Sequence, residues 1–432
     1  MSPLTVLERY GRASATGSRV IGLVCRACGS TSPADAVNAC ERCFGPLDVQ
    51  YDYSEVARLV SRDSIENGPN SLWRYRALLP FEEPEGDGVE LVTLGEGLTP
   101  LVRARNLGDE LGLRNLYLKN DTVNPTGSFK DRVVSVALNW ARAHGFTTIA
   151  CASTGNLANS LAAYAAHARM HAMVFIPADL EPAKITGTAI FRPVIVAVDG
   201  TYDDVNRLCS ELADATDWAF CNINVRPFYS EGSKTLTFET AEQLGWRLPD
   251  EIVIPVASGC QFVKHRKAVG ELIDLGLVHR DSRVPRLTGA QAAGCAPVAT
   301  AFASGADTVE PVRPHTIARS IAIGNPSDGA YVLRIARQTG GVVASVSEED
   351  ILEGIELLAA SEGIFAETAG GVTVAVLRKL ARSGRWSGQE TVVAYITGHG
   401  LKTADAVAER QPPLEPVPPS LRAFRERYPG LA

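Results

Sequence analysis

The sequence of 432 residues lacks several features that mark specialised classes of protein. No stretch approaches the roughly 20 apolar residues that cross a bilayer, and residues 1–18 have no apolar core of signal-peptide length. No long lysine and arginine block occurs, and the formal net charge of -7 argues against a broad nucleic-acid surface. Nine cysteines are too few for a disulfide scaffold in a chain this long. We therefore expect a cytoplasmic protein that binds neither membranes nor nucleic acid.

The composition is that of an ordinary globular protein. Hydrophobic residues make up 45% of the chain and charged residues 21%. A chain of this length can bury a large core and is expected to form more than one domain.

Four of the cysteines form two Cys-x-x-Cys pairs, Cys25 and Cys28 in CRAC and Cys40 and Cys43 in CERC, with residues 29–39 between the pairs. Each pair turns the backbone so that both sulfurs can face one ion. Four thiolates close a tetrahedral shell and leave no position for water or substrate. We expect a structural Zn²⁺ in an N-terminal zinc ribbon. The alternative is two disulfides or unrelated thiols.

From about residue 115, apolar strand-like runs alternate with segments of helical periodicity such as NLANSLAAYAAHA. This alternation predicts an α/β fold with parallel sheets covered by helices on both faces. Ligands of such sheets bind beyond the carboxyl ends of the strands. The strand-like runs are LYLK (116–119), TTIACAS (147–153), AMVFIPA (172–178), VIVAV (194–198), WAFCNI (218–223) and EIVIPVA (251–257).

Two of the expected strands end in turns of small and polar residues. In STGN, Ser153, Thr154 and Asn156 precede an alanine-rich helix, and a helix N-terminus of this kind suits a carboxylate. The simpler interpretation is a helix N-cap. In the second turn, Ala257, Ser258 and Gly259 would let backbone amides approach a phosphate closely. Neither turn matches a Rossmann G-x-G-x-x-G or a Walker P-loop.

Lys130 follows a Gly-Ser-Phe turn at the expected start of a helix. Pyridoxal phosphate accounts for all three features, because it offers an aldehyde to Lys130, a phosphate to the second turn and an amino-acid substrate whose carboxylate suits the first. A Schiff-base lysine must lose its proton easily, which desolvation promotes, and Phe129 is consistent with such shielding. The alternative is a surface lysine after an N-cap Ser128.

Six segments, in order, resemble the threonine synthase family of fold-type-II pyridoxal-phosphate enzymes. The resemblance covers the chain from about residue 90 to 410. It implies a tryptophan synthase β-like fold of two lobes with parallel-rich sheets, to which the zinc ribbon looks like an addition. The segments are GEGLTPL (95–101), NPTGSFKDR (124–132), STGN (153–156), EGSKT (231–235), GIFAETAGG (363–371) and TGHGLKT (397–403).

The resemblance also implies roles for individual residues. Lys130 would bind the cofactor as a Schiff base, and Asn156 would hydrogen-bond the cofactor's 3′ oxygen. Thr397 would face the pyridine nitrogen. Further, Ser153 and Thr154 would hold the substrate carboxylate, and Ala257, Ser258 and Gly259 would form the phosphate-binding loop.

The family reaction converts O-phosphohomoserine and water to threonine and phosphate. The departing phosphate needs a cationic clamp, and the segment NINVRPFYSEGSKT offers Asn224, Arg226 and Lys234 for it. Lys119 is a further candidate. The alternative for each charged residue is an ordinary ion pair.

Three positions depart from the family pattern and leave other functions open. His399 stands where asparagine is usual, and the segment containing Cys260 and His265 is less typical of the family. Cys260 would lie at a helix N-terminus, where the pKa of a thiol falls. A cysteate-synthase-like replacement of phosphoserine by sulfite, or a threonine dehydratase-like elimination, would retain Lys130 and Asn156. A non-catalytic binding or regulatory protein with the ribbon as its interaction module is the alternative of a different class.

The connections predict how the chain divides into domains. Residues 1–51 would carry the ribbon, residues 133–235 a smaller mobile lobe, and residues 52–132 with 236–412 the larger cofactor-binding lobe. Residues 413–432 would form a proline-rich tail. We expect a homodimer acting on an amino acid with a phosphate or other anionic leaving group.

Overall fold

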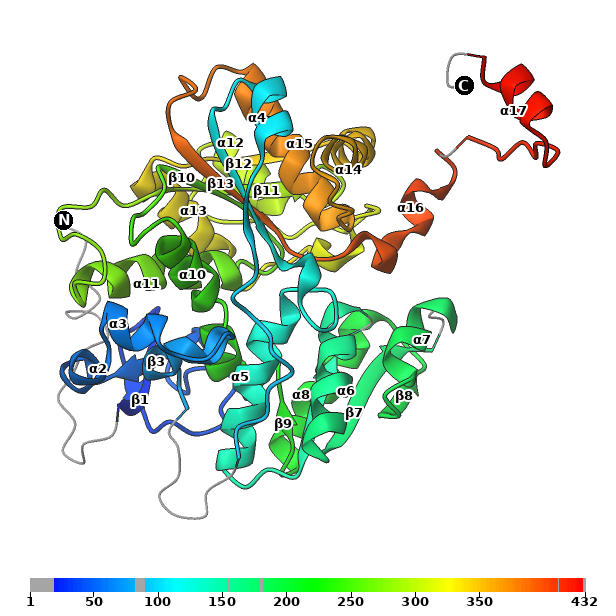
Figure 1. Ribbon diagram of the computed structural model, residues 1–432. Coiled ribbons are helices and arrows are strands. Elements are labelled where there is room, and N and C mark those ends of the chain that lie inside the picture. Colours follow the sequence, from blue (N-terminus) through cyan, green and yellow to red (C-terminus); the bar gives the residue numbers. More distant parts are fainter. Residues whose placement is uncertain (1–18, 82–89, 154, 179–181, 411, 430–432) are drawn as a thin grey trace.

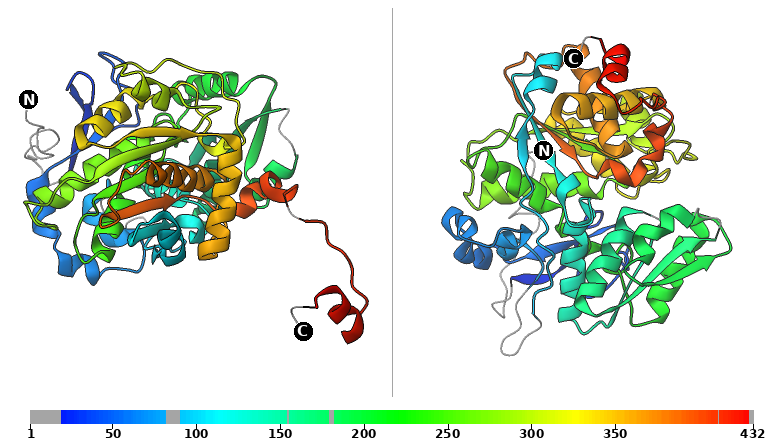
Figure 2. Two further views of the ribbon diagram at one scale, coloured as in Figure 1. Left: turned by 90° about the horizontal axis from the view of Figure 1, so that it is seen from above. Right: turned by 45° about the vertical axis from the view of Figure 1, so that its right-hand side comes forward.

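The computed structural model describes residues 19–81, 90–153, 155–178, 182–410 and 412–429 (Figure 1). Within those ranges, no helix is both long enough and apolar enough to cross a membrane. The described strands form three sheets. Two of them belong to two lobes, and the third is a small antiparallel ribbon next to them (Figures 1 and 2).

The larger sheet has the strand order β12-β11-β10-β13-β5-β4. All neighbouring strands are parallel except β4 and β5, which are antiparallel. Its strands are β4 (Leu101–Arg103), β5 (Asn115–Asn120), β10 (Glu251–Pro255), β11 (Arg286–Ala292), β12 (Val343–Val346) and β13 (Thr391–Ile396).

The smaller sheet is entirely parallel, with the order β8-β7-β6-β9. Its strands are β6 (Thr148–Ala152), β7 (His171–Pro177), β8 (Val194–Val198) and β9 (Ala219–Phe220). The prediction of parallel sheets is confirmed. The strand expected over 218–223 is shorter than predicted, because the chain turns after Phe220 and enters a helix at Arg226.

Helices cover both faces of the larger sheet, as alternate residues of its strands show. In β10, Ile252 and Ile254 enter one buried cluster, whereas Val253 enters another. Successive side chains of a strand point to opposite faces, so both faces are packed. This explains why the strand reads as a continuous apolar run in the sequence.

The helices connect and cover these strands (Figure 1). The α-helices are α2 (Tyr53–Leu59), α3 (Arg62–Glu66), α4 (Arg105–Leu111), α5 (Lys130–Ala143), α6 (Asn156–Ala168), α7 (Pro182–Ala189), α8 (Tyr202–Ala215), α9 (Arg226–Glu231), α10 (Lys234–Gln243), α11 (Cys260–Asp274), α12 (Pro297–Ala303), α13 (Gly329–Thr339), α14 (Glu348–Glu362), α15 (Thr368–Arg382), α16 (Asp405–Ala408) and α17 (Leu421–Arg427). The 3-10 helices are η1 (Leu72–Leu78), η2 (Asp121–Val123), η3 (Arg319–Ile321) and η4 (Gly400–Thr403).

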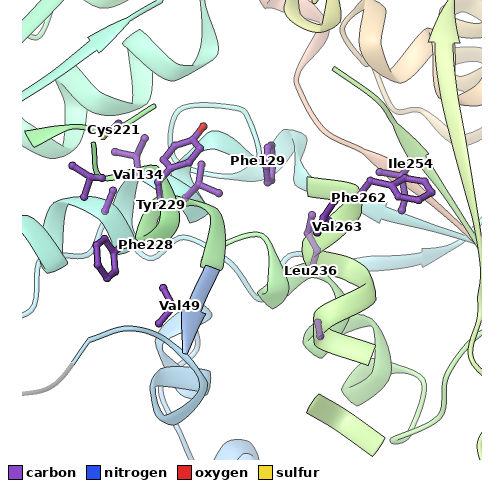
Figure 3. Close-up of a cluster of buried hydrophobic side chains, with 14 of the residues drawn as sticks. Val49, Phe129, Val134, Cys221, Phe228, Tyr229, Leu236, Ile254, Phe262 and Val263 are labelled. Atoms are coloured by element: carbon purple, nitrogen blue, oxygen red, sulfur yellow. The ribbon is translucent and has the colours of Figure 1, made fainter. Parts of the chain in front are cut away.

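The ribbon packs into the body of the protein. Its strands β1 (Val20–Cys25), β2 (Thr31–Ser32) and β3 (Leu47–Tyr51) are antiparallel in the order β2-β1-β3. Val49 of β3 is fully buried and shares its hydrophobic cluster with Phe228 of α9 (Figure 3). The ribbon therefore shares a core with both lobes. The C-terminal α17, in contrast, lies away from the lobes (Figures 1 and 2).

Candidate functional site

Lys130 is the first residue of α5, and the turn before it is tied to the end of β13. The backbone N–H of Phe129 donates to the carbonyl of Thr397 at 2.9 Å, and the N–H of His399 donates to the carbonyl of Gly127 at 2.9 Å. Gly127 has φ +73°, a conformation that favours glycine. The turn thus places Lys130 at the carboxyl edge of the larger sheet, where ligands of parallel sheets bind.

The surroundings of the Lys130 ammonium are aromatic and poor in charge. Its Nζ donates to the hydroxyl of Tyr229 at 3.1 Å and lies 5.1 Å from the centre of the Phe129 ring. Burial lowers the pKa of Lys130, and the nearby Cys260 and Glu367 offset only part of that effect. A lowered pKa favours the neutral amine, which is the nucleophilic form.

Asn156 opens α6 and faces Glu367, the residue before α15. Its side-chain amide donates to both carboxylate oxygens of Glu367, at 3.1 and 3.0 Å. Burial raises the pKa of Glu367, against the hydrogen bond from Asn156 and the charges of Lys402 and Lys130. The two residues therefore fix each other at the junction of the lobes. Ser153 precedes Asn156 and is half-buried, whereas Thr154 lies outside the described residues.

The turn over 257–259 leads from β10 into α11. Gly259 has φ +91°, and a Cβ there would lie 2.7 Å from Val332 Cγ2, so the position requires glycine. No side chain caps the N-terminus of α11, which leaves its first N–H groups available to an anion. Gln261 adds a buried side-chain nitrogen without a hydrogen-bond partner.

The four residues predicted to hold the departing phosphate do not converge. Lys234 Nζ contacts the carbonyl of Leu78 and carboxylate oxygens of Glu231 and Glu271, at 2.6, 2.7 and 2.9 Å. Three partners match the three donors of an ammonium, so none remains for phosphate.

Lys119 is engaged in the same way, with Thr99, Gln243 and Glu239 as its partners. Asn224 bonds the backbone of its own loop, at Phe220 and Trp218. This geometry argues against phosphate-binding roles for Lys119, Lys234 and Asn224, whose partners are all within the protein.

Arg226 is the member of the predicted clamp that retains solvent exposure. Its side chain is 20% exposed and pairs with Asp328 at 2.5 Å. A further cation that the sequence analysis did not single out is Lys402, which donates to Asn159 Oδ1 at 3.0 Å. It lies close enough to Glu367 for the carboxylate to act on its pKa, which burial lowers.

The four ribbon cysteines form one cluster. Their sulfur atoms all lie within 4.8 Å of one another, and Cys25 Sγ is 3.5 Å from Cys43 Sγ. All four are free thiols, so the alternative of two disulfides is wrong for this structure. Four convergent sulfurs fit one tetrahedral ion.

The structure shows the surroundings of the three residues that depart from the family pattern. Cys260 does begin α11, but burial raises the pKa of its thiol, so the expected lowering is wrong. His265 is fully buried, and its Nδ1 lies 2.8 Å from the hydroxyl of Thr237. His399 accepts from the N–H of Leu401 and caps η4.

Comparison with known proteins assigns the chain to a family. The family described as "Pyridoxal-phosphate dependent enzyme" matches residues 92–398. The chain belongs to this family.

Curated relatives within it are also similar over most of the chain. A threonine synthase of Methanosarcina acetivorans is 37% identical over 95% of this chain and 99% of its own length. Threonine synthases of Methanocaldococcus jannaschii and Mycobacterium bovis are 36% and 37% identical, over 88% and 84% of this chain and 93% and 97% of their own lengths.

Solved structures of more distant proteins share the fold. The processed form of threonine deaminase isoform 2 from Solanum lycopersicum has a TM-score of 0.59 at 21% identity, covering 73% of this chain and 84% of its own. Diaminopropionate ammonia lyase from Escherichia coli has a TM-score of 0.60 at 16% identity, covering 74% and 90%. The fold-type-II architecture expected from the sequence is thereby confirmed.

The residues present suit the cofactor of the pyridoxal-phosphate dependent enzymes. Lys130 offers an amine whose pKa is lowered, Gly259 permits close approach of a phosphate, and Gln261 carries an unpartnered buried donor beside it.

Sequence reasoning missed Tyr229 and Glu367, the two side chains that contact Lys130 and Asn156. Glu367 lies within the segment GIFAETAGG, and Tyr229 lies just before the segment EGSKT. No spacing rule marks an isolated tyrosine or glutamate as functional.

Proposed function

We propose that this chain converts O-phosphohomoserine and water to threonine and phosphate. The curated relatives with this name support the proposal, because they match 84% or more of the chain at 36–37% identity. The observation that carries it is the position of Lys130, an amine with a lowered pKa at the carboxyl edge of a parallel sheet.

Bound pyridoxal phosphate supplies an aldehyde for the lysine and a ring that withdraws electrons from the bound amino acid. Lys130 Nζ, once free, removes and returns protons at the Cα and Cβ atoms of the substrate. The Tyr229 hydroxyl, 3.1 Å from Nζ, orients that nitrogen. The N-terminus of α11 and the turn formed by Ala257, Ser258 and Gly259 hold the cofactor phosphate.

The remaining residues orient the ring and the substrate. Asn156, whose side chain is oriented by Glu367, would hydrogen-bond the 3′ oxygen, and Thr397 would hold the pyridine nitrogen. Ser153, Thr154 and the adjacent N–H groups at the start of α6 bind the substrate carboxylate. Arg226 binds the departing phosphate. Lys119, Lys234 and Asn224 do not take part, because their polar groups are occupied by partners within the protein.

Purified protein offered O-phosphohomoserine, phosphoserine with sulfite, or threonine tests the proposal. We expect threonine and phosphate from O-phosphohomoserine, measured by amino-acid analysis and phosphate release. Cysteate from phosphoserine and sulfite, or ammonia and keto acid from threonine without synthesis of threonine, would favour the cysteate-synthase-like or dehydratase-like alternative. A protein that turns over none of the three would favour the non-catalytic alternative.

We further propose that Cys25, Cys28, Cys40 and Cys43 bind one structural Zn²⁺, as their convergent sulfurs suggest. Metal analysis of protein purified without chelator should give one zinc per chain. Protein with intact free thiols and no bound metal would contradict this proposal. The lobe boundaries, with strands β6 to β9 inside 133–235, and the homodimer also remain proposals.

A further inference from the structure

The ribbon is connected to both lobes by buried polar contacts. Lys264 of α11 pairs with Asp48 of β3 at 2.7 Å, and the hydroxyl of Tyr51 donates to Glu231 of α9 at 2.9 Å. Lys267 donates to the carbonyl of Val49 at 2.8 Å. These contacts fix β3 against the two helices that border the phosphate turn and the Tyr229 segment.

A second set of contacts leads from the metal-binding loop itself. Arg26 lies between Cys25 and Cys28, and its side chain is 4% exposed. Its guanidinium is 2.6 Å from Asp328 Oδ1 and 5.1 Å from the centre of the Tyr331 ring. Its Nε also lies 3.3 Å from Asp48 Oδ2 of β3. The position of Arg26 is therefore set by the cysteine loop and β3 on one side and by the start of α13 on the other.

Asp328 links this arginine to the phosphate turn. It is fully buried, and its second carboxylate oxygen pairs with Arg226 at 2.5 Å. Its backbone N–H donates to the carbonyl of Ser258 at 2.9 Å, and its Cβ lies 3.0 Å from where a Cβ on Gly259 would stand. Asp328 is thus in direct contact with both Ser258 and Gly259 of the turn that precedes α11.

Residues of the ribbon and residues near the phosphate turn line a common recess. Arg26 and Asn38 of the ribbon line one recess together with Arg226 and Cys260. The ribbon therefore lies beside the first residue of α11, and Asp328 connects Arg26 to the turn.

We propose that Arg26 is a positioning residue for the cofactor phosphate. The cysteine loop fixes Arg26, Arg26 orients Asp328, and Asp328 holds Ser258 and Gly259 in the conformation that presents the N-terminus of α11. Loss of Arg26 leaves the buried carboxylate of Asp328 with Arg226 as its remaining ion-pair partner, which pulls Asp328 and the turn away from their present position. This proposal rests on pyridoxal phosphate as the cofactor, but not on which amino acid the enzyme converts.

The test compares Arg26→Ala with Arg42→Ala in the full-length protein. Arg42 lies in the second Cys-x-x-Cys pair but is exposed, so it is a matched control. Apoprotein is titrated with pyridoxal phosphate, and binding is followed by visible absorbance and by the ³¹P resonance of the cofactor. We expect the Kd of Arg26→Ala to rise roughly 5- to 150-fold, the range of typical coupling free energies, with a displaced ³¹P resonance. Arg42→Ala should bind as the wild type does.

Two further variants separate this mechanism from general damage to the ribbon. Arg26→Lys should give an intermediate Kd, because a lysine keeps the charge but not the planar fork. Asp328→Asn should also weaken binding, and the double variant with Arg26→Ala should be less than additive. Wild-type affinity in Arg26→Ala would overturn the proposal, as would equal losses in Arg26→Ala and Arg42→Ala, or loss of the bound metal in Arg26→Ala. A wild-type protein that binds the cofactor but makes no threonine would refute the proposed reaction and leave this inference standing.

Discussion

Lys130 and Lys264 lie in two regions of the molecule that shift the pKa of a lysine in opposite directions. Lys264 is fully buried between ribbon and lobe, and although burial acts to lower its pKa, Asp48 and Glu231 raise it overall. Lys130 is half-buried beside aromatic rings, and burial lowers its pKa. Asp48 and Glu231 contact Lys264 and keep it charged, whereas Lys130 Nζ contacts the uncharged hydroxyl of Tyr229. This difference supports the proposal that Lys130 is the amine that reacts with the cofactor.

The largest expected effect is on the reactive lysine. Lys130→Ala should lower the rate of threonine formation on the order of 10²–10⁴-fold or more, because both the Schiff base and the proton-transferring amine are lost. Borohydride reduction of the wild-type holoenzyme should fix the cofactor on the peptide that contains Lys130. Recovery of the label on a different lysine would contradict the assignment of Lys130 as the reactive lysine and Lys264 as the structural one.

Removal of the charged lysine should instead affect stability. Lys264→Met leaves Asp48 and Glu231 buried with one cationic partner fewer, which should reduce the free energy of unfolding by about 3–5 kcal/mol. Denaturant titration measures this change. The exposed Lys379→Met serves as control and should stay within about 0.5 kcal/mol of the wild type. A loss below about 1 kcal/mol in Lys264→Met would show that the ion pairs are not needed for stability.

The next residue of α11, His265, extends the comparison to pH. Burial, with a smaller contribution from Arg132, lowers the pKa of His265 from 6.5 to about 3, and its other contacts are the uncharged Thr237 and Tyr395. Between these pH values the unfolded chain binds a proton that the folded chain does not. Stability therefore rises with pH and falls on acidification through this window, by up to about 1.4 kcal/mol per pH unit from this group.

His265→Gln removes this titration and should flatten the pH dependence of the unfolding free energy between pH 6.5 and about pH 4. The exposed His279→Gln serves as the control for replacement of a histidine at the surface. An unchanged slope in His265→Gln would mean that the buried imidazole takes up its proton without cost.

The smallest effect is expected at the contact that defines the Lys130 site. Tyr229→Phe removes the hydroxyl that accepts from Lys130 Nζ, and one hydrogen bond of this kind corresponds to roughly a two- to tenfold change in rate. Because the hydroxyl accepts from the ammonium, its loss should move the pH profile of cofactor binding toward lower pH. A shift toward higher pH would indicate that the hydroxyl acts as a donor to the neutral amine.

Sequence reasoning singled out Lys130, the proposed cofactor lysine, and both turns, because glycine and other small residues there permit backbone conformations and close approaches that larger residues do not. It also located all four strands of the smaller sheet, with β9 shorter than expected, and β5 and β10 of the larger one. It did not identify β11, whose RLTGAQA mixes polar residues with glycine, or the short β12. β13 is an apolar run of ordinary strand character and was missed nonetheless.

The phosphate clamp shows where sequence patterns stop being informative. Lys119, Lys234 and Arg226 are all cations in or near motif segments, and nothing in the sequence separates them. The structure separates them by their partners: Glu239 for Lys119, Glu231 and Glu271 for Lys234. Glu239 and Glu271 come from segments that carried no motif.

The sequence by itself determined the family, and it was enough to single out Lys130 as the proposed cofactor lysine and to predict that the four cysteines converge. Only the tertiary structure decided that Lys264 has buried carboxylate partners, and that Arg26 of the ribbon pairs with Asp328, whose N–H donates to Ser258. The reason is that a side chain's charge state depends on neighbours brought from distant parts of the chain, such as Asp48 against Lys264, and local sequence carries no record of those partners.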